Sequence, residues 1–198
     1  MRIVLATHNE NKVREVAAIL AGSGIEIISQ RAAGVTDEAE ETGASFEENS
    51  RIKALAAMTA TGLPAIADDS GLCIDALDGA PGIYSARFGG ENTPYPEKCA
   101  RLLGMLDGAD TRKARFVSAA VCCFPNGDEL TAIGTVEGEI AFSMRGHNGF
   151  GYDPVFIPEG YDKTMAELSD SEKNAISHRG RAFRAMAERL EAYLKEKR

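Results

Sequence analysis

Short apolar runs of strand length alternate with an amphipathic stretch at the start of the chain. Residues 3–6 and 25–28 are such runs, and the apolar positions between them recur every three to four residues until Gly22 or Gly24 ends the pattern. Two strand-length runs around a helical period predict a β-α-β unit. A polar, acidic stretch over 34–44 follows and predicts a loop.

The next predicted helix begins at Ser45. Ser45 and Glu48 have the spacing of a capping box, in which the two side chains satisfy backbone amides at the start of a helix. We expect the inner face of this helix to contain Ile52, Leu55, Ala56 and Thr59. The apolar run 63–67 then predicts a buried strand, and two adjacent carboxylates, Asp68 and Asp69, lie at its end.

The second half of the chain adds a hairpin. The predicted elements are an ordered glycine-rich loop over 79–90, a helix over 99–106, strands over 116–124 and 130–140, and a final helix from about Gly180. Asn126-Gly127, between the two strands, is typical of a tight hairpin turn. A hairpin combined with a β-α-β unit indicates an α/β fold with a mixed sheet.

Composition and charge narrow the class of protein. The 198 residues are 44% hydrophobic, which is enough for one domain or one domain with two lobes. The net charge of -8 argues against electrostatic binding of nucleic acid. The four cysteines form no C-x-x-C pair, so we expect neither a zinc site nor disulfides. Because no apolar run has the length of a signal peptide or a membrane span, we expect a cytoplasmic protein that does not bind membranes.

The first candidate for chemistry is the segment Thr7-His8-Asn9-Glu10-Asn11-Lys12, between the first strand and the first helix. Backbone N–H groups at a helix start, together with a lysine and a threonine, form a natural cradle for phosphate. The spaced glycines of a P-loop are missing. The alternative is a polar helix cap with a solvated lysine.

The second candidate combines the acidic segment 38–43 with Asp68 and Asp69. Oxygen ligands from separate segments are what magnesium favours, since it keeps several waters and binds phosphate oxygens directly. The alternatives are a solvated acidic loop and a solvated Asp-Asp-Ser-Gly turn. Successive strand residues point to opposite faces, so we expect Asp68 and Asp69 to have different roles.

Two further candidates lie near the C-terminus. Glycines flank Phe150 in the segment 149–154, where they allow close backbone approach and leave an aromatic face for a base. The alternative is a tight turn with core aromatics. Lys173 and His178 can converge on one ligand only if the helix breaks near Ser177, which could cap the last helix. A histidine near a helix start is otherwise a structural residue.

Taken together and in order, these segments resemble the inosine/xanthosine triphosphate pyrophosphatase family. The matching residues are Thr7-x-Asn9-x-x-Lys12, Glu41-Thr42-Gly43 with Phe46 and Glu48-Asn49, Ala67-Asp68-Asp69-Ser70-Gly71-Leu72, Gly79-x-Pro81-Gly82-x-Tyr84-Ser85-Ala86-Arg87, Gly149-Phe150-Gly151-Tyr152-Asp153-Pro154, and Lys173-x-x-Ile176-Ser177-His178-Arg179. The resemblance implies an α/β fold with a long, curved mixed sheet and two lobes flanking a central substrate cleft, all within a single domain over 1–198. It also implies a homodimer that hydrolyses ITP, dITP and XTP to the monophosphate and pyrophosphate.

The resemblance also implies roles for individual residues. Glu41 and Asp69 would bind Mg²⁺, with Mn²⁺ as a substitute, and Asp69 would be the catalytic base or only a metal ligand. The phosphates would be held by the segment Thr7-His8-Asn9-Glu10-Asn11-Lys12, helped by Lys53 and Ser70. Phe150, Gly151, Tyr152 and Asp153 would form the base and ribose pocket, while Lys173, His178 and Arg179 would select a 6-oxo purine. The roles of Asp68 and Glu40 and the exclusion of GTP stay open.

Two departures from the family pattern and three alternatives accompany this resemblance. His8 stands where many members have glycine, and His147-Asn148 where Thr-Gly is common. The alternatives are a related pyrophosphatase for pyrimidine or modified nucleotides, a nucleotide sensor without hydrolysis, and a nucleic-acid-binding module. The segments 150–153 and 177–179 favour a purine enzyme over a pyrimidine one. The clustered carboxylates favour hydrolysis over a sensor that only binds nucleotide. The acidic net charge argues against a nucleic-acid-binding module.

Overall fold

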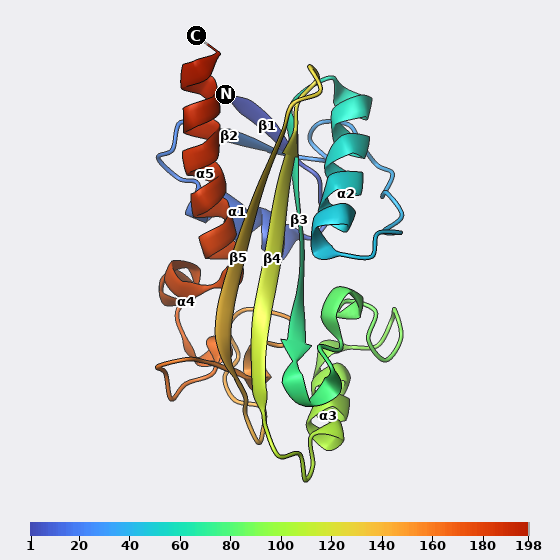
Figure 1. The fold of residues 1–198 in the computed structure, drawn as a ribbon, viewed down its shortest axis with the longest axis vertical. Helices are drawn as coiled ribbons and strands as arrows, with labels where there is room; N and C mark the ends of the chain where they lie inside the picture. The colour runs from blue at the N-terminus through green and yellow to red at the C-terminus, as the bar shows by residue number, and fades with distance from the viewer. Residues whose placement is uncertain (198) are drawn as a thin grey trace. The chain divides into compact units, whose positions relative to one another are not determined.

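The computed structural model describes residues 1–197, and the chain forms two compact units (Figure 1). Unit 1 comprises Met1–Asp69, Ser118–Gly134 and Arg179–Arg198, and unit 2 comprises Ser70–Val117 and Thr135–His178. Each unit is therefore assembled from segments that are distant in the sequence. A single domain over 1–198 stays a prediction.

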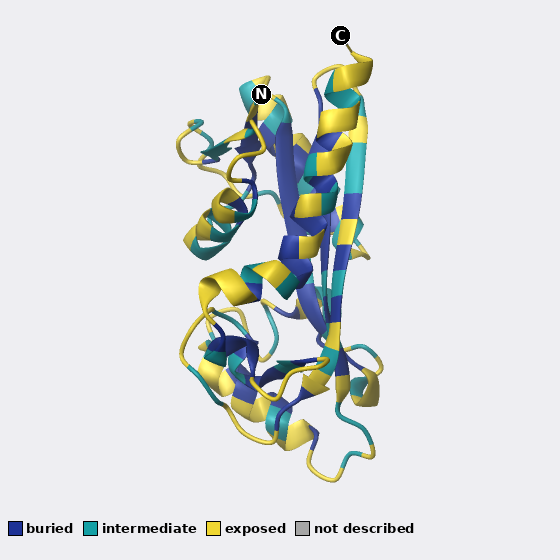
Figure 2. Cartoon of the chain, turned by 90° about the vertical axis from the view of Figure 1, so that its left-hand side faces the viewer, coloured by how far each residue is buried: buried dark blue, intermediate teal, exposed yellow. Residues whose placement is uncertain are grey.

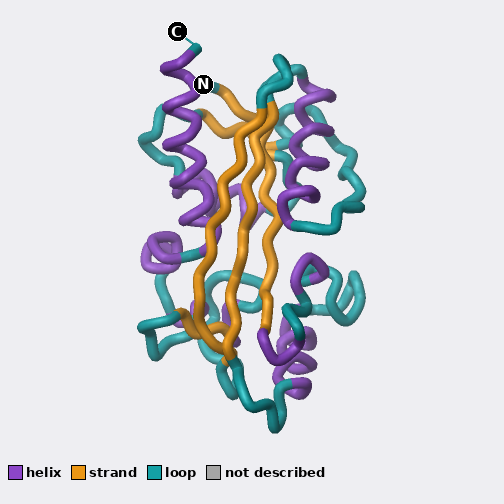
Figure 3. The backbone as a smooth tube through the Cα atoms, in the orientation of Figure 1, coloured by secondary structure: helices purple, strands orange, loops and turns teal. Residues whose placement is uncertain are grey.

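Within residues 1–197, six strands are hydrogen-bonded in the order β2-β1-β3-β4-β5-β6. The strands are the orange segments of Figure 3. Their bounds are β1 Arg2–Leu5, β2 Glu26–Ser29, β3 Ala65–Ile74, β4 Lys113–Cys123, β5 Glu129–Ile140 and β6 Phe156–Pro158. β1 pairs in parallel with β2 and β3, whereas β5 pairs antiparallel with β6. The predicted α/β class with a mixed sheet is confirmed, and the central cleft stays a prediction.

In unit 1, helices cover both faces of the strands (Figure 1). Helix α1 (Glu10–Ile19) and helix α5 (His178–Glu196) pack on one face, where Val16 and Phe183 join a buried cluster with strand residues. Helix α2 (Phe46–Thr61) packs on the other face through Ala54 and Ala57. In α5, the residues that face the sheet are buried and those on its outer face are exposed (Figure 2). The predicted β-α-β start and the apolar stripe of the last helix are confirmed.

The predicted inner face of α2 is wrong. Leu55, Ala56 and Thr59 are exposed, whereas the buried positions are Asn49, Ser50, Ala54 and Ala57. Small and polar residues let the helix lie close to the strands, and the Ser50 hydroxyl donates to the Ala119 carbonyl at 2.7 Å. The predicted N-cap is confirmed, since Ser45 Oγ accepts from the Glu48 amide at 3.1 Å.

Unit 2 is built around one apolar cluster that contains Leu72, Leu102, Phe116 and Phe156. Helix α3 (Tyr95–Met105) contributes to this cluster and begins earlier than predicted. Pro94 is its N-cap residue and Pro96 lies in its first turn. Backbone N–H groups of the first turn have no acceptor within the helix, so the missing N–H of proline costs no hydrogen bond there.

A short helix, α4 (Asp170–Ile176), ends at Ser177, where the backbone is extended. The predicted break between Lys173 and His178 is therefore confirmed. No helix among residues 1–197 is long and apolar enough to cross a membrane, and all four cysteines are free thiols.

The hairpin between β4 and β5 is confirmed and is tied to α5 through Asp128. The Phe124 amide donates to the Asp128 carbonyl at 3.0 Å, which closes the turn. The Asp128 carboxylate accepts from Tyr193 Oη at 2.8 Å and from Asn126 Nδ2 at 2.7 Å, and it pairs with Lys197 Nζ at 2.9 Å. The Lys197, Tyr193 and Asn126 contacts lower the pKa of Asp128 to about 2.

We predict that Asp128→Asn lowers the thermal midpoint at neutral pH. Because the folded pKa lies below the ordinary value of about 4, the stabilisation is present above that pH and is lost as the pH falls toward about 2. Wild type and variant should therefore differ at pH 7 and converge near pH 2 in thermal melts. Glu188→Gln, which removes an exposed carboxylate of α5, is the control. A difference that persisted at the lowest pH would contradict the role of the charge.

Candidate functional site

The first helix begins at a capped turn, as its sequence predicts. Asn9 is the N-cap of α1, and its Oδ1 accepts from the backbone amides of Asn11 at 3.0 Å and Lys12 at 3.3 Å. Thr7 Oγ1 accepts from the Asn9 amide at 3.1 Å. These bonds fix the helix start, while the phosphate role of the segment stays a prediction.

The remaining residues of this segment differ in their contacts. His8 Nε2 lies 2.8 Å from Gln30 Nε2, which also donates to the Asp37 carbonyl at 2.9 Å. The shared amide donor makes His8 Nε2 the acceptor and ties the segment to the loop after β2. Glu10 is exposed, and the Asn11 side chain accepts from Arg14.

Asp68 is a buried carboxylate surrounded by cations. Arg179 donates to its Oδ2 from Nε and Nη2, both at 3.1 Å, and Lys12 Nζ lies 3.2 Å from its Oδ1. Arg179 Nη1 also donates to Glu15 Oε2 at 2.5 Å. Burial by itself would raise the pKa of Asp68, but Arg179, Lys12 and Lys53 outweigh burial and hold that pKa well below its usual range. The cations therefore favour the ionised form of Asp68, which links α1 and α5 to β3.

Asp69 points to a different set of partners, as strand alternation predicts. Lys53 Nζ lies 3.3 Å from Asp69 Oδ1 and 2.6 Å from Glu41 Oε1, and it donates to the Asp68 carbonyl at 3.1 Å. Burial raises the pKa of Asp69, and the nearby Glu41 raises it further, against the opposing effect of Lys53. A carboxylate with a raised pKa is better suited to accept a proton.

Asn49 holds Asp69 from the other side and was assigned no role from the sequence. Its Nδ2 donates to Asp69 Oδ2 at 3.2 Å, and its Oδ1 accepts from the Gly43 amide at 2.8 Å. A Cβ at Gly43 would lie 2.7 Å from Asn49 Oδ1, so only glycine fits there. The four-residue spacing of Asn49 and Lys53 on one helix was a usable signal. Glu15 was also assigned no role from the sequence, although it lies three residues after Lys12 on the same helix and could have been found by the same spacing.

Glu41 and Asp69 fit a divalent cation. Their oxygens already converge on one positive charge, the Lys53 ammonium. Among residues 1–197 no group of three or more His, Cys, Asp or Glu side chains could hold a metal. Magnesium in nucleotide enzymes is commonly held by one or two carboxylates together with water and substrate phosphates. Two carboxylates are therefore sufficient when a triphosphate supplies the other oxygens, while Glu40 is exposed and outside this pair.

Unit 2 contains a second polar group, around Asp153. Asp153 Oδ2 accepts from the Phe150 amide at 2.8 Å and from Lys173 Nζ at 2.7 Å, and both side chains of that ion pair are almost fully buried. Lys173 Nζ lies 4.7 Å from the centre of the Phe150 ring. Gly149 has φ +70°, and a Cβ there would lie 2.1 Å from Asp153 Oδ2. The glycine therefore allows the loop to close around the carboxylate.

Tyr152 and Gly151 belong to this loop, whereas His178 contacts a strand residue. Tyr152 is buried, and its hydroxyl donates to the Ser85 carbonyl at 2.9 Å. Gly151 adopts φ +70°. The buried His178 ring stacks on Phe116, with centroids 4.7 Å apart and planes 15° apart.

The predicted site residues are thus divided between the two units, and the two sets are called the unit 1 group and the unit 2 group. Unit 1 holds Thr7, His8, Asn9, Glu10, Asn11, Lys12, Glu41, Lys53, Asp69 and Arg179, and unit 2 holds Ser70, Phe150, Gly151, Tyr152, Asp153, Lys173 and His178. Peptide bonds join the groups at Asp69–Ser70 and at His178–Arg179. The pairing of Arg179 with Asp68 and Glu15 was not expected, because the sequence suggested a contact with the purine. Its part in base selection stays a prediction.

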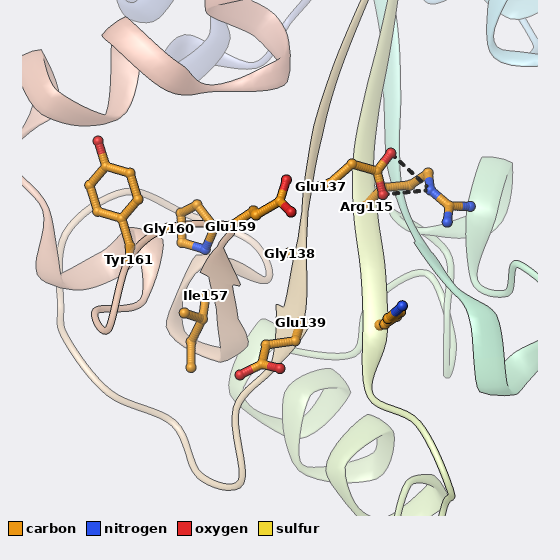
Figure 4. A pocket seen from close by; sticks show the side chains of 10 residues that line it. Arg115, Glu137, Gly138, Glu139, Ile157, Glu159, Gly160 and Tyr161 are labelled. Atoms are coloured by element: carbon orange, nitrogen blue, oxygen red, sulfur yellow. Dashed lines mark hydrogen bonds and ion pairs between the residues drawn. The ribbon is translucent and has the colours of Figure 1, made fainter.

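A cavity of about 410 Å³ in unit 2 lies outside both groups (Figure 4). Residues of β4, β5 and β6 and of the segment 159–161 line it, and none of them was predicted as a site residue. Arg115 in its wall is paired with Glu137 at 3.1 Å and with Asp75 at 3.0 Å. We assign no role to this cavity.

The chain is similar to known proteins over nearly its whole length. The model of the Ham1 family matches residues 3–189. A dITP/XTP pyrophosphatase of Exiguobacterium sp. is 46% identical over 195 residues, covering 98% of this chain and 100% of the relative, and one of Gluconobacter oxydans is 47% identical over 184 residues, covering 93% and 88%. The solved HAM1 protein from Coxiella burnetii has a TM-score of 0.89 at 44% identity, covering 97% of this chain and 99% of that one. The Staphylococcus aureus Ham1 protein has a TM-score of 0.88 at 40% identity, covering 98% and 100%.

We predict that Arg179→Met strongly destabilises the protein. Removing one partner of a buried ion pair costs about 3–5 kcal/mol, since the other charge remains buried. Among residues 1–197, Lys12 would then be the remaining side-chain ion-pair partner of Asp68. Denaturant unfolding measures the change, with Arg189→Met on the exposed face of the same helix as the control. A loss no larger than that of the control would show that Asp68 does not depend on Arg179.

Proposed function

The chain belongs to the Ham1 family, and from this we propose that it hydrolyses the non-canonical purine triphosphates ITP, dITP and XTP to the monophosphate and pyrophosphate. The observation that carries the proposal is the convergence of Glu41 and Asp69 on one cation beside the capped start of α1. The names of the curated relatives support the substrate class. A cytoplasmic location and a homodimer stay predictions.

The unit 1 group would bind the metal and the phosphates. Glu41 and Asp69 would hold Mg²⁺, with Mn²⁺ as a substitute, and the bound ion would neutralise phosphate charge and lower the pKa of water. Lys12 and Lys53 carry ammonium groups within 3.3 Å of the Asp68-Asp69 pair and would contact phosphate oxygens. The partial positive charge at the start of α1 would add to this, since the Asn9, Asn11 and Lys12 amides themselves donate to Thr7 and Asn9 within the capped turn.

Asp69 is the residue best suited to act as the base. Its pKa is raised, and a carboxylate with a raised pKa is a stronger base toward an attacking water. Asn49 fixes the orientation of this carboxylate. Attack on the α-phosphorus would form a P–O bond and break the bond to the β-phosphate. The charge that develops on the leaving pyrophosphate would be stabilised by Lys12 and the helix start.

The unit 2 group would recognise the base. The Phe150 ring offers a stacking face. The buried Lys173 lies beside that ring, and the buried His178 follows Lys173 by five positions in the chain. Donors from Lys173, His178 or backbone N–H groups would pair with a 6-oxo group, whereas adenine presents a donor there. Leaving a buried donor unpaired costs about 1–3 kcal/mol, which would disfavour ATP.

Pyrophosphate release from ITP, XTP, GTP, ATP and dTTP at equal concentrations tests the proposal. We expect fast release from ITP and XTP with Mg²⁺, little from the other three, and none when a chelator is present. Release mainly from dTTP would assign the protein to pyrimidine nucleotides instead. Binding of ITP without release would identify a nucleotide sensor.

We predict that Asp69→Asn lowers kcat by at least about a hundredfold, the usual contribution of a positioned acid or base. The substitution keeps the shape of the side chain and removes its charge, so the thermal midpoint should stay close to that of wild type. Asp107→Asn, at an exposed position of unit 2, is the matched control. A kcat like that of wild type would remove Asp69 from both of its proposed roles.

A further inference from the structure

Lys98 is a buried lysine that the proposed mechanism does not use. It lies on α3, and only 2% of its surface is exposed. Within the described residues, no carboxylate forms an ion pair with it, and burial lowers its pKa. Burying an ammonium group is unfavourable unless strong partners replace its water. The partners that it has therefore indicate what it does.

Those partners are a backbone carbonyl and an aromatic ring. Lys98 Nζ donates to the Ala86 carbonyl and lies 5.0 Å from the centre of the Tyr95 ring, one turn earlier on the same helix. Ala86 belongs to the segment Tyr84-Ser85-Ala86-Arg87, which is part of the family pattern and has no role in the proposed mechanism. Lys98 thus holds this segment to α3.

The neighbouring carbonyl of the segment is held by the loop around Phe150. Tyr152 Oη donates to the Ser85 carbonyl, while Ser85 Oγ accepts from the Leu72 amide at 2.9 Å and donates to the Gly82 carbonyl at 2.7 Å. Two consecutive carbonyls, of Ser85 and Ala86, are therefore fixed by side chains from two different elements. Their positions depend on each other because they share one short turn.

Helix α3 also contacts the Phe150 loop directly. The rings of Tyr95 and Tyr152 meet edge to face with centroids 5.4 Å apart. A Cβ on Gly151 would lie 3.6 Å from the Tyr95 ring, so the loop backbone passes close to that ring. Tyr95 thus touches Lys98 on one side and the loop on the other.

We propose that Lys98 is a positioning residue for base recognition, whose ammonium fixes the Ser85-Ala86 turn and, through Tyr95 and Tyr152, the loop that carries Phe150 and Asp153. This inference rests on the proposed function, because it assumes that this loop binds the purine. In the described part of the chain, the polar partners of Lys98 are the Ala86 carbonyl and the Tyr95 ring, and neither belongs to the residues that would hold the metal or the phosphates. Its loss should therefore weaken binding of the base and leave hydrolysis unchanged.

Lys98→Met tests this, since it keeps the aliphatic chain and removes the charge and the donor. We expect the KM for ITP to rise by about threefold to tenfold, the effect of losing one hydrogen bond, with kcat within about twofold of wild type. Inorganic tripolyphosphate, which lacks a base, should keep its inhibition constant as a competitor of ITP. Lys113→Met, at an exposed position of the same unit, is the control.

Lys98→Gln is the second variant and decides the question if Lys98→Met does not fold. It keeps a polar side chain but removes the ammonium that donates to the Ala86 carbonyl, so it should also raise the KM for ITP without changing inhibition by tripolyphosphate. An unchanged KM for ITP, or equal losses for ITP and tripolyphosphate, would overturn the role of Lys98 and leave it a structural residue. Failure of the wild-type protein to hydrolyse ITP or XTP would instead overturn the proposed function, so the two failures are distinguishable.

Discussion

The ion pair between Asp68 and Arg179 is the contact on which the rest of unit 1 depends. A carboxylate without water must be compensated by nearby cations, and Asp68 obtains them from α5 through Arg179 and from α1 through Lys12. The strand end, the first helix and the last helix are therefore linked by one buried charge. Asp68 has two cationic partners, Arg179 and Lys12. Glu15 pairs with the Nη1 atom of Arg179 and supplies a second negative charge to the network.

This network places the residue beside it. Asp69 follows Asp68 in the strand and must point to the opposite face, where Lys53 and Asn49 of α2 meet it. One carboxylate is kept ionised by its cations, while the other has a raised pKa because burial and Glu41 disfavour its charged form. The pKa values of two identical side chains are therefore shifted in opposite directions by their surroundings.

The sequence predicted the local features and missed most long-range partners. The cap at Ser45, the hairpin turn at Asn126-Gly127 and the break at Ser177 were predictable because each depends on residues a few positions apart. The inner face of α2 was predicted wrongly, because periodicity assumes that buried positions are apolar, and this helix buries Asn49 and Ser50 instead. The motifs supplied the residues of the candidate site, and their roles stay predictions.

The partners within the candidate site were harder to predict. Arg179 and Asp68 are 111 positions apart, and nothing local distinguishes an arginine that binds a ligand from one that neutralises a buried carboxylate. Lys98 was likewise assigned no role from the sequence, since its acceptor is a carbonyl on a turn that no side-chain pattern reveals.

The charge of the unit 1 group explains why a metal ion belongs to the proposed reaction. Three cations, Lys12, Lys53 and Arg179, face four carboxylates, those of Glu15, Glu41, Asp68 and Asp69. Such a group has a slight negative excess and would not attract a triphosphate by itself, least of all in a chain with a net charge of -8. A divalent cation on Glu41 and Asp69 would reverse that sign and would compete with the Lys53 ammonium for the same oxygens. Lys53 would then be available to the phosphates, so the same two carboxylates would bind the metal and release a cation toward the substrate.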